Sequence, residues 1–524
     1  MSTSLFEIVG PVMVGPSSSH TAGMARIGAM AGRIAGFEPE RIVLRLSPTL
    51  RTTYHGHRTD ASLIGGALGW APNDPKIKHA LSVAAERGID VKIAFFPPNI
   101  YHPNTVQLEM TSGDGEALKV RGISVGGGSI VIDAIDDCSL QLDPALYHMV
   151  VWGDGAEKAV RKLAEGLDPK PVVQGAAGVW TVSSVIPVPG ADKAENELNA
   201  MPGIEKVSIV APVLEYGATI SEKYKYSSCE ELIAACRSEG ISLSEAAQRY
   251  EEDRSGHRRE QIRALMHEQL DVMREAVRHG LEEPNEMLYG LTSGEDGKRM
   301  LRQSQHSISG GIVPLAAAKA LAVMEHNASM GCIVAAPTAG SAGIVPGCML
   351  ALQDQYGFSD DRIVDAMFVS AVLGVIMAHR DISFSGSVGG CQAEVGVSAG
   401  IAAAGIASLF SEEPEVPVQA MAMCIKNMLG LICDPIAGPI EVPCIKRNAG
   451  GVANAFISAD MACAGIESYL PPDQVLDALL DVEKRLPGEL RCTTTGGLAC
   501  AARAVCLRKE LEKELDRELD REQS

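Results

Sequence analysis

The stretch HMVVWGDGAEKAVRKLAE, residues 148–165, decides the expected fold, because a strand-like apolar run passes directly into a helical one. Four further elements follow in the order strand, strand, helix, strand. The six expected elements are His148–Trp152, Ala156–Glu165, Val172–Gln174, Val179–Ile186, Ala191–Met201 and Val207–Pro212. A compact βαββαβ order is the ferredoxin-like motif. We therefore expect such a module at residues 144–213, with continuation of the preceding domain as the alternative.

The sequence before this module alternates short apolar runs with turns, which indicates a mixed α/β domain at residues 1–143. Its expected elements are a helix at Ala22–Ile34 and strands at Ile42–Leu46, Val91–Phe96, Thr105–Thr111 and Ile130–Ile135. After a linker at residues 214–228 the chain becomes strongly helical, with Ser228 and Ser242 as predicted helix caps. We expect a multidomain α+β protein whose last domain, residues 226–524, is all-helical.

Composition limits the possible partners. A chain of 524 residues exceeds one ordinary core, and 53 Gly with only 4% aromatic residues indicates packing through small side chains. The formal charge of −20 repels phosphate backbones and anionic membranes, so we expect neither nucleic acid nor a membrane as a partner.

The apolar segments and the cysteines indicate the cellular compartment of the protein. Residues 1–6 lack a basic leader, so we expect no signal peptide. The run Val395–Phe410 is shorter than the ~20 residues of a membrane span and is expected to form a buried helix. Thirteen Cys without a regular framework favour reduced thiols and a cytoplasmic protein.

Three cysteines, Cys391, Cys433 and Cys444, each lie close to a Gly or Pro, where the backbone can bend around an inorganic core. Thiolates ligate iron or zinc. Their spacing by itself favours three buried structural thiols, since it contains no C-x-x-C pair. If the three hold a cubane, its fourth iron stays open and can act as a Lewis acid.

A second motif, GPSSSHTAG at residues 15–23, opens the first helix. Its candidate binding residues are Ser17, Ser18, Ser19, His20 and Thr21. Hydroxyls, an imidazole and free backbone N–H groups at the positive end of a helix dipole can hold a carboxylate. The alternative is an N-cap, but five such residues in a row exceed what capping needs.

Two further segments contain candidate polar groups. In YHGHRTD, residues 54–60, a His is a candidate general base whose tautomer Thr59 or Asp60 would fix, or else a surface residue. The segment HPNT, residues 102–105, fits a turn into a strand. Asn327 precedes the loop APTAGSAG, residues 336–343, which could hydrogen-bond a small polar substrate or form a tight interhelical turn. The loop's candidate residues are Thr338, Gly340 and Ser341.

Together these motifs resemble the iron–sulfur-dependent L-serine dehydratase (L-serine ammonia-lyase) family. GPSSSHTAG, GHRTD and HPNT are similar to its β component. NASMG (residues 327–331), APTAGSAG, GGCQAEVG (389–396), KNMLGLICDP (426–435) and EVPCIKRNA (441–449) are similar to its α component. The two components look fused here, and the module between them resembles an ACT-type regulatory module.

The resemblance implies a [4Fe-4S] cluster on Cys391, Cys433 and Cys444, and conversion of L-serine to pyruvate and ammonia. It implies that Ser17–Thr21 hold the substrate carboxylate, that His57 takes the Cα proton and that an open iron binds the hydroxyl. It also implies a homo-oligomer, at least a dimer. Some single-chain relatives end in a Cys that caps the fourth iron. This chain ends in residues 520–524 without one, so a water or the substrate is the expected fourth ligand, although Cys492, Cys500 and Cys506 lie nearby.

Two other classes of protein remain as alternatives. A pyridoxal-phosphate dehydratase would need a Schiff-base Lys and a phosphate cup. Residues 493–497, TTTGG, are a superficial cup, but no Lys stands in a matching context. A non-catalytic, amino-acid-sensing or zinc-held protein would have no use for GPSSSHTAG beside three loop cysteines.

Overall fold

The computed structural model describes residues 3–51, 53–97, 102–188, 190–214, 216–438 and 440–522. The chain forms two compact units. One, the sheet unit, comprises Ser19–Ser221, and the other, the helical unit, comprises Met1–Ser18 with Glu222–Ser524. Residues 1–18 thus group with the second half of the chain. The predicted domain limits at residues 143, 213 and 226 stay predictions. Residues 1–2 and 523–524, named in the expectations for the two termini, lie outside the described residues.

The sheet unit begins with a six-stranded sheet in the order β3-β2-β4-β5-β6-β7. Its strands are β2 (Arg41–Leu46), β3 (Asp90–Phe95), β4 (Thr105–Thr111), β5 (Ala117–Gly126), β6 (Ser129–Ile135) and β7 (Cys138–Leu142). Only β2 and β3 pair in parallel among these described strands. The sequence predicted β2, β3, β4 and β6. It missed β5 and β7, although β5 alternates buried and exposed residues as a half-buried strand does.

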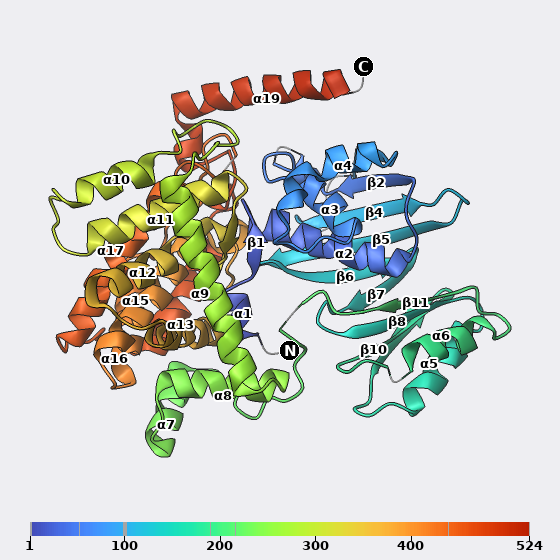
Figure 1. The fold of residues 1–524 in the computed structure, drawn as a ribbon, viewed down its shortest axis with the longest axis horizontal. Helices are drawn as coiled ribbons and strands as arrows, with labels where there is room; N and C mark the ends of the chain where they lie inside the picture. The colour runs from blue at the N-terminus through green and yellow to red at the C-terminus, as the bar shows by residue number, and fades with distance from the viewer. Residues whose placement is uncertain are drawn as a thin grey trace. The chain divides into compact units, whose positions relative to one another are not determined.

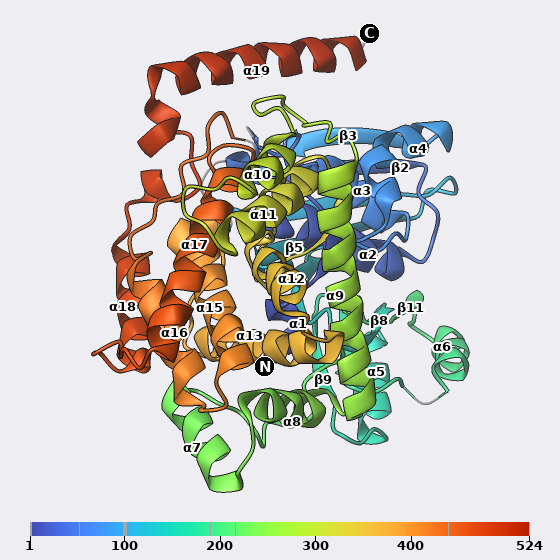
Figure 2. The same ribbon diagram turned by 60° about the vertical axis from the view of Figure 1, so that its left-hand side comes forward.

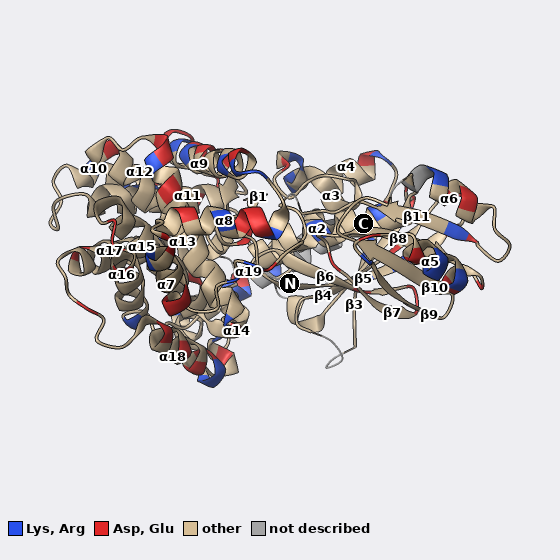
Figure 3. Ribbon diagram, turned by 90° about the horizontal axis from the view of Figure 1, so that it is seen from below, with Lys and Arg blue, Asp and Glu red and all other residues tan. Residues whose placement is uncertain are grey.

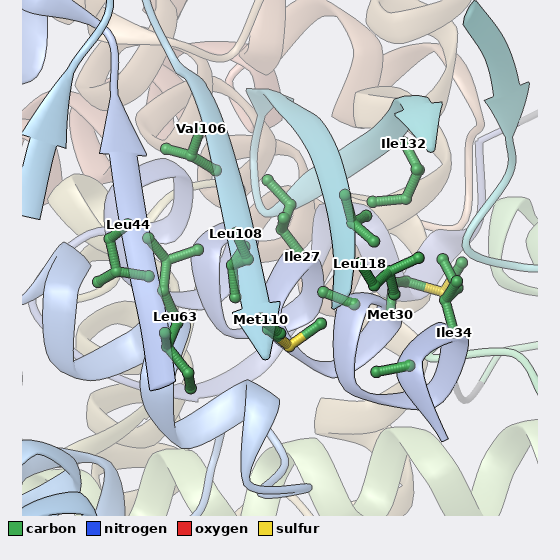
Figure 4. Close-up of a cluster of buried hydrophobic side chains, with 14 of the residues drawn as sticks. Ile27, Met30, Ile34, Leu44, Leu63, Val106, Leu108, Met110, Leu118 and Ile132 are labelled. Carbon is green, nitrogen blue, oxygen red and sulfur yellow. The ribbon is translucent and has the colours of Figure 1, made fainter. Parts of the chain in front are cut away.

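Helices α2 (Gly23–Ala35), α3 (Thr59–Ala67) and α4 (Ala80–Glu86) belong to this unit. Figure 4 shows Ile27 of α2 near Leu108 of β4 and Leu63 of α3 near Leu44 of β2, and these residues belong to one buried cluster with Met30 and Ile34. Helices α2 and α3 touch through glycine, because a Cβ on Gly66 would lie 2.0 Å from the Ala25 carbonyl oxygen. The packing through small residues that the composition predicted is therefore present here.

The predicted βαββαβ order is confirmed in the second half of the sheet unit. Its elements are β8 (Tyr147–Trp152), α5 (Ala156–Glu165), β9 (Val172–Ala176), β10 (Val179–Ser184), α6 (Ala191–Asn199) and β11 (Lys206–Val210). The strands lie in the order β11-β8-β10-β9, and every neighbouring pair is antiparallel. One face packs on α5 and α6, while Val150 and Val179 on the other join the core of the first sheet.

The helical unit contains long helices, several of which have no charged face. They are α7 (Cys229–Glu239), α8 (Leu243–Ser255), α9 (Arg259–Glu282), α10 (Asp296–Ser304), α11 (Val313–Ala328), α12 (Ile344–Tyr356), α13 (Asp360–His379), α15 (Val397–Phe410), α16 (Glu415–Lys426), α17 (Cys444–Cys463), α18 (Pro472–Arg485) and α19 (Ala502–Glu522), with the short α1 (Leu5–Ile8) and α14 (Gly386–Gly389). Figures 1 and 2 show α11, α12, α15 and α17 side by side in both views. Figure 3 shows acidic and basic residues along α9 and α18, whereas α15 carries neither.

The predicted caps are present, since Ser228 and Ser242 accept hydrogen bonds from the backbone N–H groups of Glu231 and Glu245. The expectation that residues 226–524 are all-helical is wrong in one place. Strand β12 (Cys332–Val334) pairs antiparallel with β1 (Val12–Val14), because the N-terminal segment supplies a partner from the far end of the chain.

Two helices, Asp360–His379 and Gln392–Phe410, are long and apolar enough to cross a membrane. However, 78% and 83% of these windows are buried inside the protein, as in core helices. The predicted burial of residues 395–410 is therefore confirmed.

Candidate functional site

Cys391, Cys433 and Cys444 come together in the helical unit. Cys391 precedes the π-helical turn Gln392–Gly396, and Cys444 is the first residue of α17. Cys433 lies in the loop between α16 and α17. The Sγ atoms of Cys391 and Cys433 lie within 4.8 Å of each other, and Cys444 is close enough to Cys391 for that thiol to raise the pKa of Cys444. The structure thus brings the three predicted ligands into one neighbourhood.

A carboxyl group that the sequence analysis did not single out belongs to the same cluster. The Sγ atoms of Cys391 and Cys433 and a carboxylate oxygen of Glu394 all lie within 4.8 Å of one another. Burial raises the pKa of Glu394 to about 7, although a hydrogen bond from Thr338 Oγ1, 3.1 Å long, opposes this rise. Glu394 can therefore hold or release a proton near neutral pH. The motif CQAEVG contained it, but no spacing rule marks a lone Glu.

A glycine allows this close approach. A Cβ on Gly386 would lie 2.5 Å from Glu394 Oε2 and 3.2 Å from Cys433 Sγ. Contacts as short as 2.5 Å do not occur for real side chains, so any larger residue at this position must displace the carboxyl group. Gly386 leaves room for the Glu394 carboxyl beside the two sulfurs.

Arg447, one turn into α17, contacts one side of the group formed by Cys391, Cys433 and Cys444, called here the sulfur cluster. Its guanidinium donates to Cys391 Sγ at 3.3 Å and to the Asp434 carboxylate at 2.8 Å. Asp434 also accepts a hydrogen bond of 2.7 Å from the backbone N–H of Leu498. A guanidinium at this position can offset part of the negative charge of a metal-bound thiolate.

Hydrogen bonding and burial hold two of the thiols protonated. Hydrogen bonds with Cys391 and then Cys492 raise the pKa of Cys433 well above its ordinary value, and burial adds to this. Burial, followed by the charges of Cys391 and Glu394, raises the pKa of Cys444. A thiol-rich set with one carboxylate matches soft metals and iron–sulfur clusters, and binding would release the thiol protons.

The predicted loop residues lie beside Glu394. Thr338 bonds Glu394 directly, and a Cβ on Gly340 would lie 3.2 Å from Glu394 Oε1. Ser341 Oγ donates to the carbonyl of Ala336, which is the role of a residue that shapes a turn. The loop is therefore a tight turn, as one alternative predicted, and it also places polar groups at a candidate site, as the other did.

Asn327 anchors the same loop. Its Nδ2 donates to the carbonyl oxygens of Ala339 at 3.0 Å and Pro16 at 3.4 Å. Its buried Oδ1 finds no hydrogen-bond partner among the described residues. Asn327 thus connects the segment around Pro16 to the loop that carries Thr338.

The segment that carries His20 is joined by hydrogen bonds to the loop that carries His57. The segment Ser18–Ala22 forms a π-helical turn that leads into α2, and Ser18, Ser19 and Thr21 are buried, with Ser17 half-buried. Thr21 Oγ1 donates to the carbonyl of His57 at 2.8 Å, and Thr59 Oγ1 donates to the carbonyl of His20 at 2.9 Å. Two reciprocal hydrogen bonds therefore join the turn to the loop that carries His57.

His57 is buried, so the alternative of a surface histidine is wrong for it. Burial, followed by the charge of His20, lowers the pKa of His57 to about 3. The expected orienting partners bond elsewhere, since Thr59 bonds the backbone of His20 and Asp60 pairs with His55 Nδ1 at 3.4 Å. Nδ1 of His57 has no hydrogen-bond partner among the described residues. A buried nitrogen without a partner is a candidate contact for a ligand.

Asn104, in the segment expected to be only a turn, contacts the other histidine. His20 Nε2 lies 3.2 Å from Asn104 Oδ1, and Asn104 Nδ2 donates to the Ser124 carbonyl at 3.3 Å. The structure therefore assigns a polar role to a residue that the sequence analysis left as part of a turn.

Comparison with known proteins finds two family models that match different parts of the chain. Residues 238–499 match the family model described as serine dehydratase alpha chain, and residues 4–134 match serine dehydratase beta chain. The chain is 41% identical over 287 residues to the probable L-serine dehydratase alpha chain of Bacillus subtilis, covering 55% of this chain and 95% of that one. It is 44% identical over 154 residues to the probable beta chain of the same organism, covering 29% and 69%.

A single-chain relative aligns along almost the whole length. The L-serine dehydratase of Streptomyces coelicolor is 27% identical over 514 residues, covering 95% of this chain and 99% of that one. The sulfur cluster lies within the alpha-chain match and the paired histidines within the beta-chain match. The chain belongs to the serine dehydratase family and carries its alpha-chain and beta-chain regions on one polypeptide.

Proposed function

We propose that the protein is an L-serine ammonia-lyase that converts L-serine to pyruvate and ammonia with a [4Fe-4S] cluster on Cys391, Cys433 and Cys444. The observation that carries this proposal is the convergence of Cys391 and Cys433 with the Glu394 carboxyl group, whose ligand atoms all lie within 4.8 Å of one another. The names of the alpha-chain, beta-chain and single-chain relatives support the substrate.

The donor set fits such a cluster. Sulfur ligands suit iron–sulfur clusters, and the Arg447 guanidinium beside Cys391 offsets part of the negative charge that thiolates would add. When bound, a cluster with one iron free of protein thiolate supplies a Lewis acid for the departing hydroxyl group. Glu394 would hold, at one of its carboxyl oxygens, the proton that this hydroxyl needs to leave as water.

His57 would accept the Cα proton of serine. Its low pKa keeps the imidazole neutral at working pH, which a base requires, but also makes it a weak base in the free protein. A substrate carboxylate held by Ser17–Thr21 would stabilise the imidazolium and raise this pKa. Removal of the proton and the hydroxyl leaves aminoacrylate, which tautomerises and hydrolyses to pyruvate and ammonia without further catalysis.

Other polar groups would orient the substrate. Thr338 and Gly340 lie beside Glu394, and Asn327 has an unpartnered buried Oδ1, so these residues are proposed to contact serine, with Ser341 shaping the loop. Residues 144–213 are proposed to form an ACT-like module, which the β11-β8-β10-β9 order supports. We further propose a cytoplasmic homo-oligomer, at least a dimer.

The test is anaerobic purification followed by iron and sulfide analysis and a serine-to-pyruvate assay. We expect a brown, oxygen-sensitive protein that makes pyruvate. Cys433→Ser should lose both iron and turnover, whereas Cys463→Ser, which changes an exposed thiol on α17, should keep both. Full activity in Cys433→Ser would overturn the ligand assignment.

Two outcomes would replace the proposal as a whole. A yellow protein that reacts with borohydride would indicate pyridoxal phosphate. Stoichiometric zinc without pyruvate formation would indicate a structural metal site.

A further inference from the structure

The outward side of α17 carries few of the charges expected of a solvent-facing helix. Helices α11, α15 and α16 pack against its other side (Figure 2). Apart from Cys463 at the last helical position, the exposed residues recur at intervals of four and three, the spacing of a coiled-coil seam. This stripe, called here the α17 face, consists of Lys446, Gly450, Ala453, Ile457, Asp460 and Ala464. Its middle is therefore small or apolar, with charges only towards the two ends.

Helix α18 shows how an ordinary exposed face differs. Its exposed residues are all polar, namely Gln474, Asp477, Asp481, Lys484 and Arg485. In the middle of α17, by contrast, Ile457 is 54% exposed. Contiguous apolar surface that is left exposed commonly marks a site of protein–protein contact. The α17 face is therefore typical of a surface that another chain covers.

The segment that follows α17 adds to this surface. Ile466, Tyr469 and Leu470 are 52%, 94% and 45% exposed. Tyr469 has a φ of 67°, in the left-handed region that an aromatic residue seldom adopts. Its neighbour Ser468 is buried, and the Ser468 N–H donates to Gln419 Oε1 of α16 at 2.7 Å. The backbone is thus anchored on α16 while the Tyr469 ring stays exposed.

The α17 face is complementary to itself. In two antiparallel α17 helices related by a two-fold axis at Ala453, residues equally far before and after Ala453 lie opposite each other. Lys446 and Asp460 stand seven residues before and after it, so each ammonium faces a carboxylate of the second copy. Ile457 of one copy reaches Gly450 of the other, where a Cβ would meet nothing within 4 Å. A parallel pair would instead set like charges against each other.

Both charged groups are available for this contact. Within the described parts of the chain, no basic side chain forms an ion pair with Asp460. Lys446 Nζ pairs with Asp296 of its own chain at 2.8 Å, but its side chain is 58% exposed and the ammonium has three N–H donors. The chain's formal charge of −20 makes its copies repel one another, so a cation on the α17 face favours association there.

We propose that the α17 face is the surface on which a second copy of this chain binds, with the two α17 helices antiparallel. This inference rests on the homo-oligomer of the proposed function and not on its chemistry. A stable dimer buries about 800 Å² on each partner. One helix face ~30 Å long supplies less than this, so the contact also takes in Ile466, Tyr469 and Leu470.

The first test is analytical ultracentrifugation of the full chain, purified anaerobically. The wild type should have the mass of an even number of chains. Ile457→Glu should halve that mass at micromolar concentration, because it places a carboxylate in the apolar middle of the contact. Ile308→Glu, which charges a fully exposed apolar residue outside α17, should match the wild type. Circular dichroism should show the same helical content in all three proteins.

The second test uses Lys446→Glu and Asp460→Lys. Each variant alone sets like charges against each other at both ends of the contact and should weaken dimerisation at least about tenfold. An equimolar mixture of the two restores opposite charges at both ends. Native mass spectrometry should therefore detect a heterodimer about as tight as the wild-type dimer.

Each other outcome has a definite meaning. A wild type with one chain or an odd number of chains, or an unchanged mass in Ile457→Glu, overturns the inference. Single charge variants that dimerise as tightly as the wild type, or a mixture no tighter than either variant, overturn the antiparallel pairing. An assembled wild type that makes no pyruvate from serine overturns the proposed function and leaves the α17 face as the contact surface.

Discussion

The imidazole rings of His20 and His57 stack in the sheet unit with their centroids 4.7 Å apart and an interplanar angle of 18°. Two charged rings at this distance would repel each other. Burial lowers the pKa of His20, and burial together with His20 lowers that of His57, so both rings are neutral at physiological pH. A neutral pair of imidazole rings can accept a proton. The residue that hydrogen-bonds to a ring decides which of its two nitrogens carries a hydrogen and which is free to accept a proton.

Asn104 sets the tautomer of His20. Its Nδ2 donates to the Ser124 carbonyl, so its Oδ1 must face His20 Nε2, which then carries the hydrogen. Asn104→Ala should lower turnover about tenfold, the equivalent of one hydrogen bond of ~1.4 kcal/mol, with unchanged iron content. Nitrogen-15 NMR of the imidazoles checks the tautomer directly. An unchanged His20 spectrum in Asn104→Ala would contradict this role.

Acidification should destabilise the fold through buried histidines. Burial lowers the pKa of His148 to about 4, while its ring bonds Ser183 Oγ at 2.7 Å and the Asp143 carbonyl at 2.8 Å. Below pH ~6.5 the unfolded chain binds a proton that the folded chain excludes, so stability falls with pH down to about 4 for His148 and about 3 for His57. Each residue contributes at most about 1.4 kcal/mol per pH unit in this window.

Denaturant titrations of the wild type and His148→Gln at several pH values measure this contribution. The variant should show a shallower loss of stability between pH 6 and pH 4.5, because glutamine takes up no proton. Equal pH slopes in the two proteins would show that His148 titrates normally in the folded state.

Enlarging Gly386 should disturb the sulfur cluster. The Cβ of Gly386→Ala would meet Glu394 Oε2 at 2.5 Å, so the carboxyl group must move, at a cost of about 1–3 kcal/mol. We expect less bound iron after reconstitution and a lower melting temperature. Gly450→Ala on α17 is the matched control, because its Cβ meets nothing within 4 Å. Equal iron content in both variants would mean that the carboxyl moves without affecting the cysteines.

A buried ion pair joins the N-terminal segment to α8. Glu251, fully buried, accepts hydrogen bonds from Ser4 Oγ and the Leu5 N–H and pairs with Arg254 at 2.6 Å. Arg254→Ala leaves this carboxylate without its cation and should cost about 3–5 kcal/mol. Arg278→Ala, which breaks an exposed pair on α9, should cost less than about 1 kcal/mol. Denaturant titration compares them, and similar losses would contradict the importance of burial.

The sequence by itself determined features that depend on neighbouring residues. The βαββαβ order at residues 147–210, the caps at Ser228 and Ser242 and the buried helix α15 all follow from local periodicity and local hydrogen bonds. Cys391, Cys433 and Cys444 could be named in advance, but through family resemblance rather than through their spacing.

Only the tertiary structure decided which side chains surround those cysteines. Cys492 meets Cys433 because of a β-bridge between distant segments, and Glu394 reaches the sulfurs because Gly386 leaves space for it. Strand β12 exists because the N-terminal segment supplies β1 as its partner. The contact of Cys492 with Cys433 and the pairing of β12 with β1 join residues far apart in the chain, so no local pattern of polarity or spacing encodes them. These contacts form only when the helical unit as a whole is packed.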